Sequence, residues 1–183
     1  MEQLIAAVFT LFTSLVDIPA AKALMATAKD TKLTVPIATQ HVAAARFAGI
    51  LTDIDPDLLL AIAHHESRYE PKVVGPLVRG KRACGVLQHV PITARCPEPS
   101  ILRDYVNGAK HLAEWIHAQR DLKRALIGYA GGYALLGMCD RGEAPRMCTI
   151  ANYHQARAKR IKRARKLGEK RHATRVRVAA PPS

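Results

Sequence analysis

A helix is predicted for residues 55–67, which read Asp-Pro-Asp-Leu-Leu-Leu-Ala-Ile-Ala-His-His-Glu-Ser. Asp55 can accept hydrogen bonds from the first free backbone amides, and Pro56 falls where its missing N–H costs nothing. The residues that recur at helical spacing, and so define a buried face, are Leu58, Leu59, Ile62 and His65. Because Ala and Leu recur at helical periods elsewhere and aromatic residues make up only 5% of the chain, we predict an all-α or mainly helical α+β fold.

Glu66 lies at the C-terminal end of this apolar helix. A half-buried carboxyl at such a position finds few amides to stabilise its charge, so desolvation favours the neutral acid and raises its pKa. An acid catalyst that works near neutral pH requires a pKa raised in this way. Glutamates at helix ends are also common in purely structural positions, so Glu66 alone does not establish a catalytic site.

Two further segments follow Glu66 and Ser67 in a fixed order. Residues 83–94 read Ala-Cys-Gly-Val-Leu-Gln-His-Val-Pro-Ile-Thr-Ala, and residues 125–132 read Ala-Leu-Ile-Gly-Tyr-Ala-Gly-Gly. Together the three segments resemble the lytic transglycosylase family with a lysozyme-like domain, the soluble lytic transglycosylase (SLT) domain. That family places Glu-Ser at a helix end, then a Gly-Leu-Met-Gln-like segment followed by Pro-x-Thr-Ala, and then Ala-Tyr-Asn-Ala-Gly. The resemblance covers about residues 40 to 160 and departs from the family at Ala130, where the family has asparagine.

The resemblance implies a reaction that needs only one carboxylate. In the family a single glutamate, here Glu66, protonates the glycosidic oxygen between N-acetylmuramic acid and N-acetylglucosamine in peptidoglycan glycan strands. The same residue then takes the proton of the muramic acid C6 hydroxyl, which closes a 1,6-anhydro ring without water, cofactor or metal. Glu70, one turn further on, is expected to lie in a solvated turn, and a role in catalysis is the less favoured alternative. The remaining nearby acids belong to the helix start, where capping explains them: Asp53, Asp55 and Asp57.

The same resemblance implies further site residues. The hydroxyl of Tyr129 is expected to point at the reacting glutamate or at a nearby sugar. Ser67 and Gln88 are expected to hydrogen-bond the sugar or its N-acetyl group, and the backbone at Gly85 and Val86 is expected to pass close to the glycan. The structural alternatives are a helix-end hydroxyl for Ser67, an exposed polar side chain for Gln88 and a core aromatic for Tyr129.

Composition divides the chain into three predicted parts: an apolar helical leader at 1–35, the lysozyme-like domain at 36–156 and a basic helical tail at 157–183, which continues the last helix. From Arg157 to Arg177, eleven Lys or Arg stand against one acidic residue, which accounts for +10 of the formal net charge of +13. Such a tail suits nucleic acid, anionic wall polymers or anionic lipid heads, although it lacks aromatic residues for base stacking. The alternative is a disordered tail that serves solubility.

The leader contains an apolar run at 4–16 that is too short to span a bilayer comfortably. Ala-Lys-Ala at 21–23 could serve as a signal-peptide cleavage site, but Glu2 stands where a signal peptide needs positive charge. We therefore favour an amphipathic helix that packs on the body, on a partner subunit or on a membrane.

The other elements are predicted from periodicity and turn residues. Helices are expected in four further places: about 37–50, 100–116, 121–130 and from about Met147. Residues 70–99, rich in Gly, Pro and charge, are expected to form a loop or short-hairpin wall beside a cleft. The segment 131–148 is expected to form a second loop.

Four cysteines fall into two local pairs, Cys84 with Cys96 and Cys139 with Cys148. Neither pair has the spacing of a zinc knuckle, and the histidines before Glu66 lack the rest of a zinc deaminase or zinc protease motif, so we predict no metal site. Two local disulfides would suit an oxidising compartment. Four free thiols are the alternative, and three pairings remain formally possible.

The resemblance to the SLT family implies a peptidoglycan lytic transglycosylase, and we expect it to work in a virion or in the bacterial periplasm and cell envelope. We favour a phage virion enzyme that opens the wall locally during genome entry, with other virion proteins as partners. One alternative is a wall-opening enzyme of a secretion or conjugation apparatus. Others are a hydrolytic muramidase resembling goose-type lysozymes and a catalytically idle structural subunit that binds glycan or nucleic acid.

Overall fold

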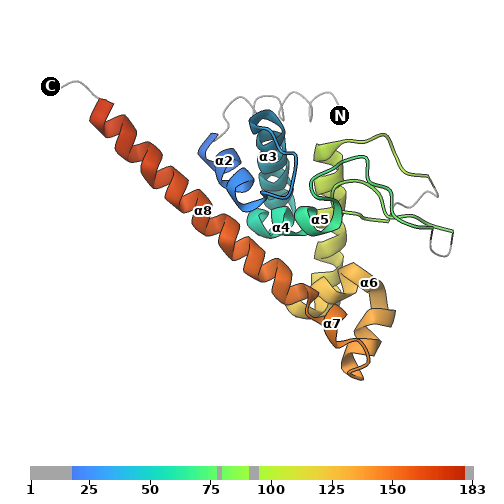
Figure 1. Ribbon diagram of the computed structural model, residues 1–183. Coiled ribbons are helices and arrows are strands. Elements are labelled where there is room, and N and C mark those ends of the chain that lie inside the picture. The colour runs from blue at the N-terminus through green and yellow to red at the C-terminus, as the bar shows by residue number, and fades with distance from the viewer. Residues whose placement is uncertain (1–17, 78–79, 91–94, 180–183) are drawn as a thin grey trace.

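The protein is mainly helical in the computed structural model, which describes residues 18–77, 80–90 and 95–179, with side chains up to Lys170 (Figure 1). Its helices in these ranges are α2 (Ile18–Thr27), α3 (Val35–Thr52), α4 (Pro56–Ser67), α5 (Ile101–Gln119), α6 (Leu122–Asp140), α7 (Pro145–Cys148) and α8 (Ile150–Ala179). Between α4 and α5 the described chain forms isolated bridges, Val74 with Cys84 and Cys84 with His89, and no regular strand. The predicted mainly helical fold with a loop wall is confirmed.

Helix α4, which carries Glu66, occupies the centre of the fold (Figure 1). Helices α3 and α8 pack against it, α2 packs against both of these, and α5 packs against α3 and α6. The largest fully buried side chains come from most of these elements: Leu24, Leu59, Ile62, Leu87, Tyr105, Leu112, Leu126 and Ile161. Each such side chain contributes roughly 1.5–3 kcal/mol through burial, so the packing of the whole domain sets the position of α4.

Helices α4 and α5 each begin at a residue whose side chain caps the helix. At the start of α4, Oδ1 of Asp55 accepts the backbone N–H of Asp57 at 2.9 Å. At the start of α5, Oγ of Ser100 accepts a backbone N–H from Arg103 at 3.3 Å. Asp121 caps α6 in the same way. A cap of this kind typically stabilises a helix by about 1 kcal/mol. Because each capping side chain bonds an amide only two or three residues away, these helix starts are encoded locally.

Helix α6 continues where we expected a loop. Residues 131–140 remain helical apart from a kink at Gly132, where φ is 67° and ψ is −167°. Glycine suits this position because it adopts positive φ without steric cost. The helix resumes after the kink because Leu135 and Leu136 are buried against the core. The predicted loop at 131–148 is therefore wrong, since most of this segment belongs to α6 and α7.

The basic segment predicted as a tail belongs to helix α8, which reaches Ala179. Ile161 of this segment is only 2% exposed. The guanidinium of Arg157 donates a hydrogen bond to the carbonyl of Thr27 at the end of α2, at 2.8 Å. The first turns of the segment therefore pack on the body, and a disordered tail does not describe them.

Two ion pairs join α8 to the start of α4. Lys162 lies 3.3 Å from the carboxylate of Asp55, and Arg165 lies 2.9 Å from that of Asp57. The Asp57 side chain is almost completely buried, so loss of its partner would leave a buried unpaired charge, which is strongly destabilising. Truncation after residue 156 would consequently disturb packing as well as charge.

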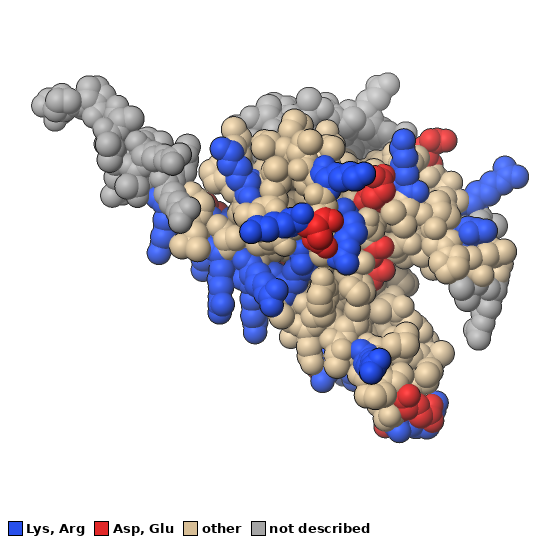
Figure 2. All heavy atoms as spheres, viewed as in Figure 1, with Lys and Arg blue, Asp and Glu red and all other residues tan. Residues whose placement is uncertain are grey.

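Lys and Arg side chains gather along the outer face of α8 (Figure 2). The exposed cations of this face for which the described residues offer no ion pair are Lys159, Arg160, Arg163 and Lys166. The opposite, apolar face of α8 is covered by α2 and α4. We refer to these four residues as the basic face.

Both predicted disulfides are present, Cys84–Cys96 and Cys139–Cys148, and the described residues contain no free cysteine. The first disulfide ties the wall to the segment that leads into α5. The second ties the end of α6 to α7. Local pairing was thus the correct choice among the three connectivities.

The leader is described only from Ile18 onwards, so the apolar run at 4–16 lies outside the described residues, as does the Pro-Ile-Thr-Ala segment at 91–94. Ala21 and Ala23 of the possible cleavage site are buried in α2, which favours a packed helix there. None of the described helices is long and apolar enough to cross a membrane.

Candidate active site

Glu66 lies in the last turn of α4 and is half-buried. Burial raises its pKa from an ordinary value of 4.5 to about 7, and desolvation alone accounts for this shift. Near neutral pH the carboxyl therefore populates both protonation states, as a group that donates and then accepts a proton requires.

Helix α4 ends abruptly because the two residues after Ser67 adopt left-handed conformations. The φ angle is 55° at Arg68 and 67° at Tyr69, which costs roughly 1–3 kcal/mol for each non-glycine residue. The buried ring of Tyr69, whose hydroxyl donates to the carbonyl of Leu60 at 3.0 Å, offsets part of this cost. The chain thus turns away directly after Ser67, and no further helical turn covers the Glu66 carboxyl.

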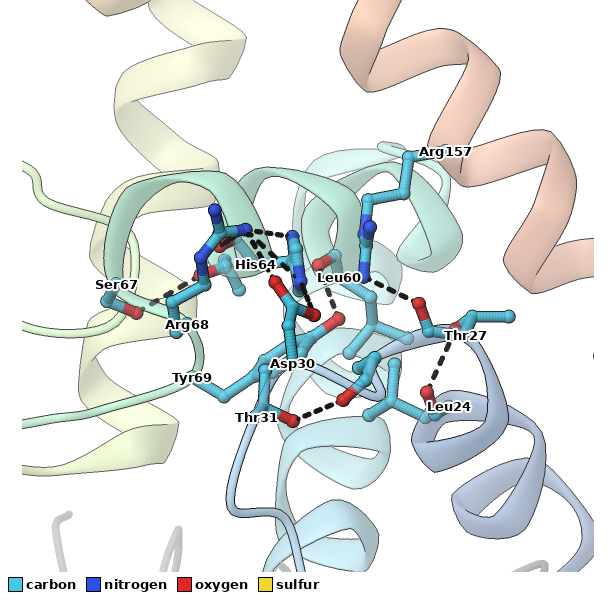
Figure 3. A network of polar contacts seen from close by, with 12 residues as sticks. Leu24, Thr27, Asp30, Thr31, Leu60, His64, Ser67, Arg68, Tyr69 and Arg157 are labelled. Atoms are coloured by element: carbon cyan, nitrogen blue, oxygen red, sulfur yellow. Dashed lines mark hydrogen bonds and ion pairs between the residues drawn. The ribbon is translucent and has the colours of Figure 1, made fainter.

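A polar network around His64 holds the C-terminal end of α4 in place (Figure 3). Nε2 of His64 donates to Oδ1 of Asp30 at 2.8 Å, while Nδ1 accepts from the guanidinium of Arg68 at 2.7 Å. The hydroxyl of Tyr153, on α8, lies 3.3 Å from the same Nδ1. Burial lowers the pKa of His64, so the ring is neutral at pH 7 and one tautomer satisfies these contacts.

The turn formed by residues 84–89 is fastened to α4 and α6 through its backbone carbonyls. Oγ of Ser67 donates to the carbonyl of Val86 at 2.8 Å. The hydroxyl of Tyr129 donates to the carbonyl of Leu87 at 2.6 Å. Two side chains that the sequence assigned to the site therefore position this turn beside Glu66.

Inside the turn, Gly85 and Gln88 both adopt positive φ, 74° and 48° respectively. The side-chain amide of Gln88 donates to the carbonyl of Gly85 at 2.8 Å and to that of Val73 at 3.0 Å. Gly85 cannot be replaced without strain, since a β-carbon there would overlap the carboxylate of Asp104. Glycine is thus required by close approach as well as by φ.

Asp104 supports the site, although the sequence motifs did not point to it. Its carboxylate is 2% exposed and accepts the backbone N–H of Val86 at 3.1 Å. Burial raises its pKa to about 6, although the Val86 N–H and the charge of Arg103 oppose that shift. The sequence offered one sign of this role. Asp104 lies on the same face of α5 as the buried residues Tyr105, Ala109 and Leu112, where a carboxylate is unusual.

Tyr129 and Glu66 interact electrostatically. The pKa of the tyrosine hydroxyl is raised well above its usual range, first by burial and then by the Glu66 carboxylate. The hydroxyl itself is bonded to the carbonyl of Leu87 in the 84–89 turn. The structure thus brings Tyr129 to Glu66, but the hydrogen bond that it makes goes to the turn.

Rings from α4 and α8 meet next to Glu66. The ring of His65 lies 5.1 Å from those of Tyr153 and His154. Burial lowers the pKa of His154 to about 4, so this ring is neutral near pH 7.

Among the described residues, no three His, Cys, Asp or Glu side chains are grouped so that they could hold a metal ion.

The comparison of the chain with protein-family models gives one match. The family described as the transglycosylase SLT domain matches residues 43–138, more than half of the chain. The chain belongs to the transglycosylase SLT domain family. It is a peptidoglycan lytic transglycosylase. No curated protein and no solved structure gives a match.

In this transglycosylase the matched region runs from α3 to α6 and contains Glu66, the 84–89 turn and Tyr129. Helices α2, α7 and α8 lie outside it, although α2 and α8 pack directly on the matched helices. Ala130, which replaces the family asparagine, is exposed on α6 beside Tyr129. At this exposed position the chain has a methyl group where the resemblance leads one to expect a polar side chain.

Proposed function

We propose that the enzyme cleaves the β-1,4 bond between N-acetylmuramic acid and N-acetylglucosamine and leaves 1,6-anhydro ends. Glu66 donates its proton to the glycosidic oxygen as the bond to C1 breaks. The C6 hydroxyl of the muramic acid then bonds to C1 and returns its proton to Glu66, so the enzyme ends in its starting state. The pKa of about 7 at Glu66 supports one residue acting first as acid and then as base.

The absence of a second suitable carboxylate among the described residues supports the anhydro product over hydrolysis. Asp104 is buried behind the 84–89 turn and holds its backbone. Glu70 is exposed, and its carboxylate accepts the backbone N–H of Lys72 at 3.1 Å. A hydrolytic enzyme generally needs a second carboxylate flanking the bond, as nucleophile or to activate water.

The remaining predicted site residues are proposed to act mainly by shaping the turn. Ser67 and Val86 are buried and bonded to each other, so we assign them to support of Glu66 and not to direct sugar contact. Gln88 is partly exposed, and Gly85 allows the tight turn, so these two form the wall along which the glycan passes. Tyr129 connects this wall to the acid.

Mass spectrometry of fragments released from peptidoglycan sacculi tests the proposal. We expect anhydro-muramic ends, which are one water lighter than hydrolysed ends. Reducing ends would establish hydrolysis and would require a second carboxylate, with Glu70 as the first to examine. No release by folded protein would support the alternative of a subunit without catalytic activity.

We further propose that the enzyme acts outside the cytoplasm, in a phage virion that opens the wall for genome entry. The wall substrate of its family and the two disulfides support a location outside the cytoplasm. The basic face supports a second, anionic partner such as nucleic acid. Detection of the protein in purified phage particles would support this role. Detection only in bacterial envelope fractions would favour a secretion or conjugation apparatus.

The basic face is proposed to bind its anionic partner electrostatically. Its helix cannot insert into a bilayer through its apolar side, because α2 and α4 cover that side. We expect a triple variant to bind a DNA duplex more weakly and with a smaller dependence on salt. Its substitutions are Lys159→Gln, Arg163→Gln and Lys166→Gln. The slope of log K against log salt should fall by about 0.9 for each phosphate that the variant no longer neutralises. Lys123→Gln on α6 is the control, and equal binding by the triple variant and wild type would refute the proposal.

A further inference from the structure

The turn between α2 and α3 reaches the helix that carries the reacting glutamate. Oδ1 of Asp30, in this turn, accepts the Nε2–H of His64 at 2.8 Å, and Oδ2 lies 3.4 Å from the guanidinium of Arg68. Figure 3 shows the Asp30 carboxylate facing both of these side chains. His64 lies two residues before Glu66, and Arg68 lies two residues after it. We call Asp30, His64 and Arg68 the clamp.

The clamp lies on the side of α4 opposite the reacting carboxyl. Successive residues of an α-helix are rotated by about 100°, so the side chain of His64 leaves the helix on the face opposite that of Glu66. The guanidinium of Arg68 is bonded to Nδ1 of the same His64 ring at 2.7 Å. The clamp therefore acts on the reaction through the position of the last turn of α4.

The last turn of α4 depends on support from side chains, because the backbone bonds that close it are long. The backbone nitrogen of Arg68 lies 3.2 Å from the carbonyl oxygen of His64. The backbone nitrogen of Tyr69 lies 3.4 Å from the carbonyl oxygen of Ala63. Helix ends held by weak bonds fray. Ser67 fastens one side of this helix end to the 84–89 turn, and the clamp fastens the other side.

Within the clamp, the hydrogen bond from His64 to Asp30 carries most of the restraint. The side chain of His64 is 2% exposed, so its Nε2–H has no water to replace Asp30 as acceptor, and a buried donor without a partner is costly. The side chains of Asp30 and Arg68 are both 53% exposed. An ion pair between exposed side chains contributes little, so the imidazole is the main partner of Asp30.

The fold presents Asp30 in a fixed position. The carbonyl of buried Ala28 accepts the backbone N–H of Thr31 at 3.1 Å and the hydroxyl of the same residue at 2.6 Å, which closes the turn around Asp30. Arg157 of α8 bonds the carbonyl of Thr27, directly before this turn, at 2.8 Å. Asp30 and α8 lie outside residues 43–138, which match the family, so this support comes from segments beyond the family domain.

We infer that Asp30 is a positioning residue, which holds the last turn of α4 through His64 and so keeps the Glu66 carboxyl where it meets the glycosidic oxygen. This inference rests on the proposed role of Glu66 as the acid. Asp30 governs the rate of bond breaking, and it leaves the affinity for the glycan unchanged because it lies on the opposite side of α4 from the reacting group.

The kinetics of full-length D30A and D30N on peptidoglycan sacculi test the inference. We expect D30A to lower kcat about tenfold without raising the apparent KM, since a misplacement of about 1 Å can cost up to about 10²-fold. D30N keeps an oxygen that accepts the N–H of His64, so it should bring kcat back to within about twofold of wild type. D140A is the matched control, because it removes an equally exposed carboxylate from an ion pair with Arg124 at the end of α6.

Titration of Glu66 by carboxyl ¹³C NMR gives a second readout that needs no turnover. Burial raises the pKa of this carboxyl to about 7, so a loosened helix end should admit water and lower the pKa toward 4.5 in D30A. Loss of the Asp30 charge would also lower this pKa. D30N separates the two effects, because it lacks the charge but keeps the acceptor, and it should titrate like wild type.

The other groups around the clamp and the acid are the same in all of these variants. Arg157 and Tyr153 of α8 face His64, together with Arg68, and Tyr129 of α6 faces Glu66. D30A should melt a few degrees below D140A, because the buried N–H loses its acceptor, and it should remain folded at the assay temperature. Circular dichroism in the assay buffer measures the folded fraction.

Each outcome decides the inference. Equal kcat in D30A and D140A would overturn it, as would an unchanged pKa of Glu66 in D30A. If D30N behaves like D30A, the charge of Asp30 acts and its hydrogen bond does not, which also overturns the inference. A loss of kcat that follows the unfolded fraction of D30A would show a purely structural role. If wild-type protein releases reducing ends or nothing at all, the proposed function is wrong, and the titration of Glu66 still decides whether Asp30 positions it.

Discussion

Replacement of Glu66 by Gln is expected to lower the rate of wall lysis by about 10²–10⁴-fold, the usual contribution of a general acid–base group. Glutamine keeps the size and polarity of the side chain but cannot transfer the proton. In the wild-type enzyme the reaction begins with the protonated acid, so lysis should also decline as the pH rises above about 7, the pKa of Glu66. Turbidity of a sacculus suspension, followed from pH 5 to 9, measures both effects.

The stability of E66Q provides the control for this result. The pKa of Glu66 is raised from 4.5 to about 7 in the folded protein, so the neutral acid is favoured by folding. Its contribution is fully present below about pH 4.5 and is lost as the pH rises through 7. E66Q should therefore unfold at a temperature equal to or above that of the wild type at pH 8. Lysis at the wild-type rate by E66Q would contradict the assignment of the acid, and E70Q serves as the matched exposed control.

Replacement of Asp104 by Ala is expected to lower the free energy of unfolding by about 1–3 kcal/mol, because the buried N–H of Val86 loses its acceptor. Without its hydrogen bond to Asp104, the 84–89 turn should no longer hold its position beside Glu66, so the rate of lysis should fall as well. D104N keeps an oxygen that can accept this N–H, and it should retain the turn and most of the activity. Thermal unfolding and lysis of both variants give the comparison.

The two Asp104 variants should also differ in their response to pH. Burial raises the pKa of Asp104 from 3.8 to about 6, so its stabilising neutral form is lost as the pH rises through 6. The groups around it are Arg103 on its own helix, Tyr105, and Lys72 of the facing wall. D104N, which never ionises, should gain stability relative to wild type as the pH rises from about 4 to 6, and it should keep that gain at higher pH. If D104A were as stable and active as D104N, the hydrogen bond to Val86 would not support the site. Glu114→Gln, exposed on the same helix, is the control.

The amino-acid sequence by itself determined the local elements. The caps at Asp55 and Ser100 act within a few residues, so the starts of α4 and α5 are encoded where they occur. The close sequence spacing of the cysteines likewise favoured the two observed disulfides. The order of the motif segments pointed to the family, and the position of Glu66 at a helix end pointed to its raised pKa.

Tertiary structure decided what depends on neighbours far apart in the chain. Charge composition alone does not reveal that α8 packs on α2 and α4, because those two helices lie far from α8 in the sequence. Similarly, Asp104 supports the site only because α5 places it under Gly85, and Ser67 turns inward only because Val86 meets it there. Periodicity describes one helix at a time, whereas burial and hydrogen bonding depend on which segments the completed fold brings together.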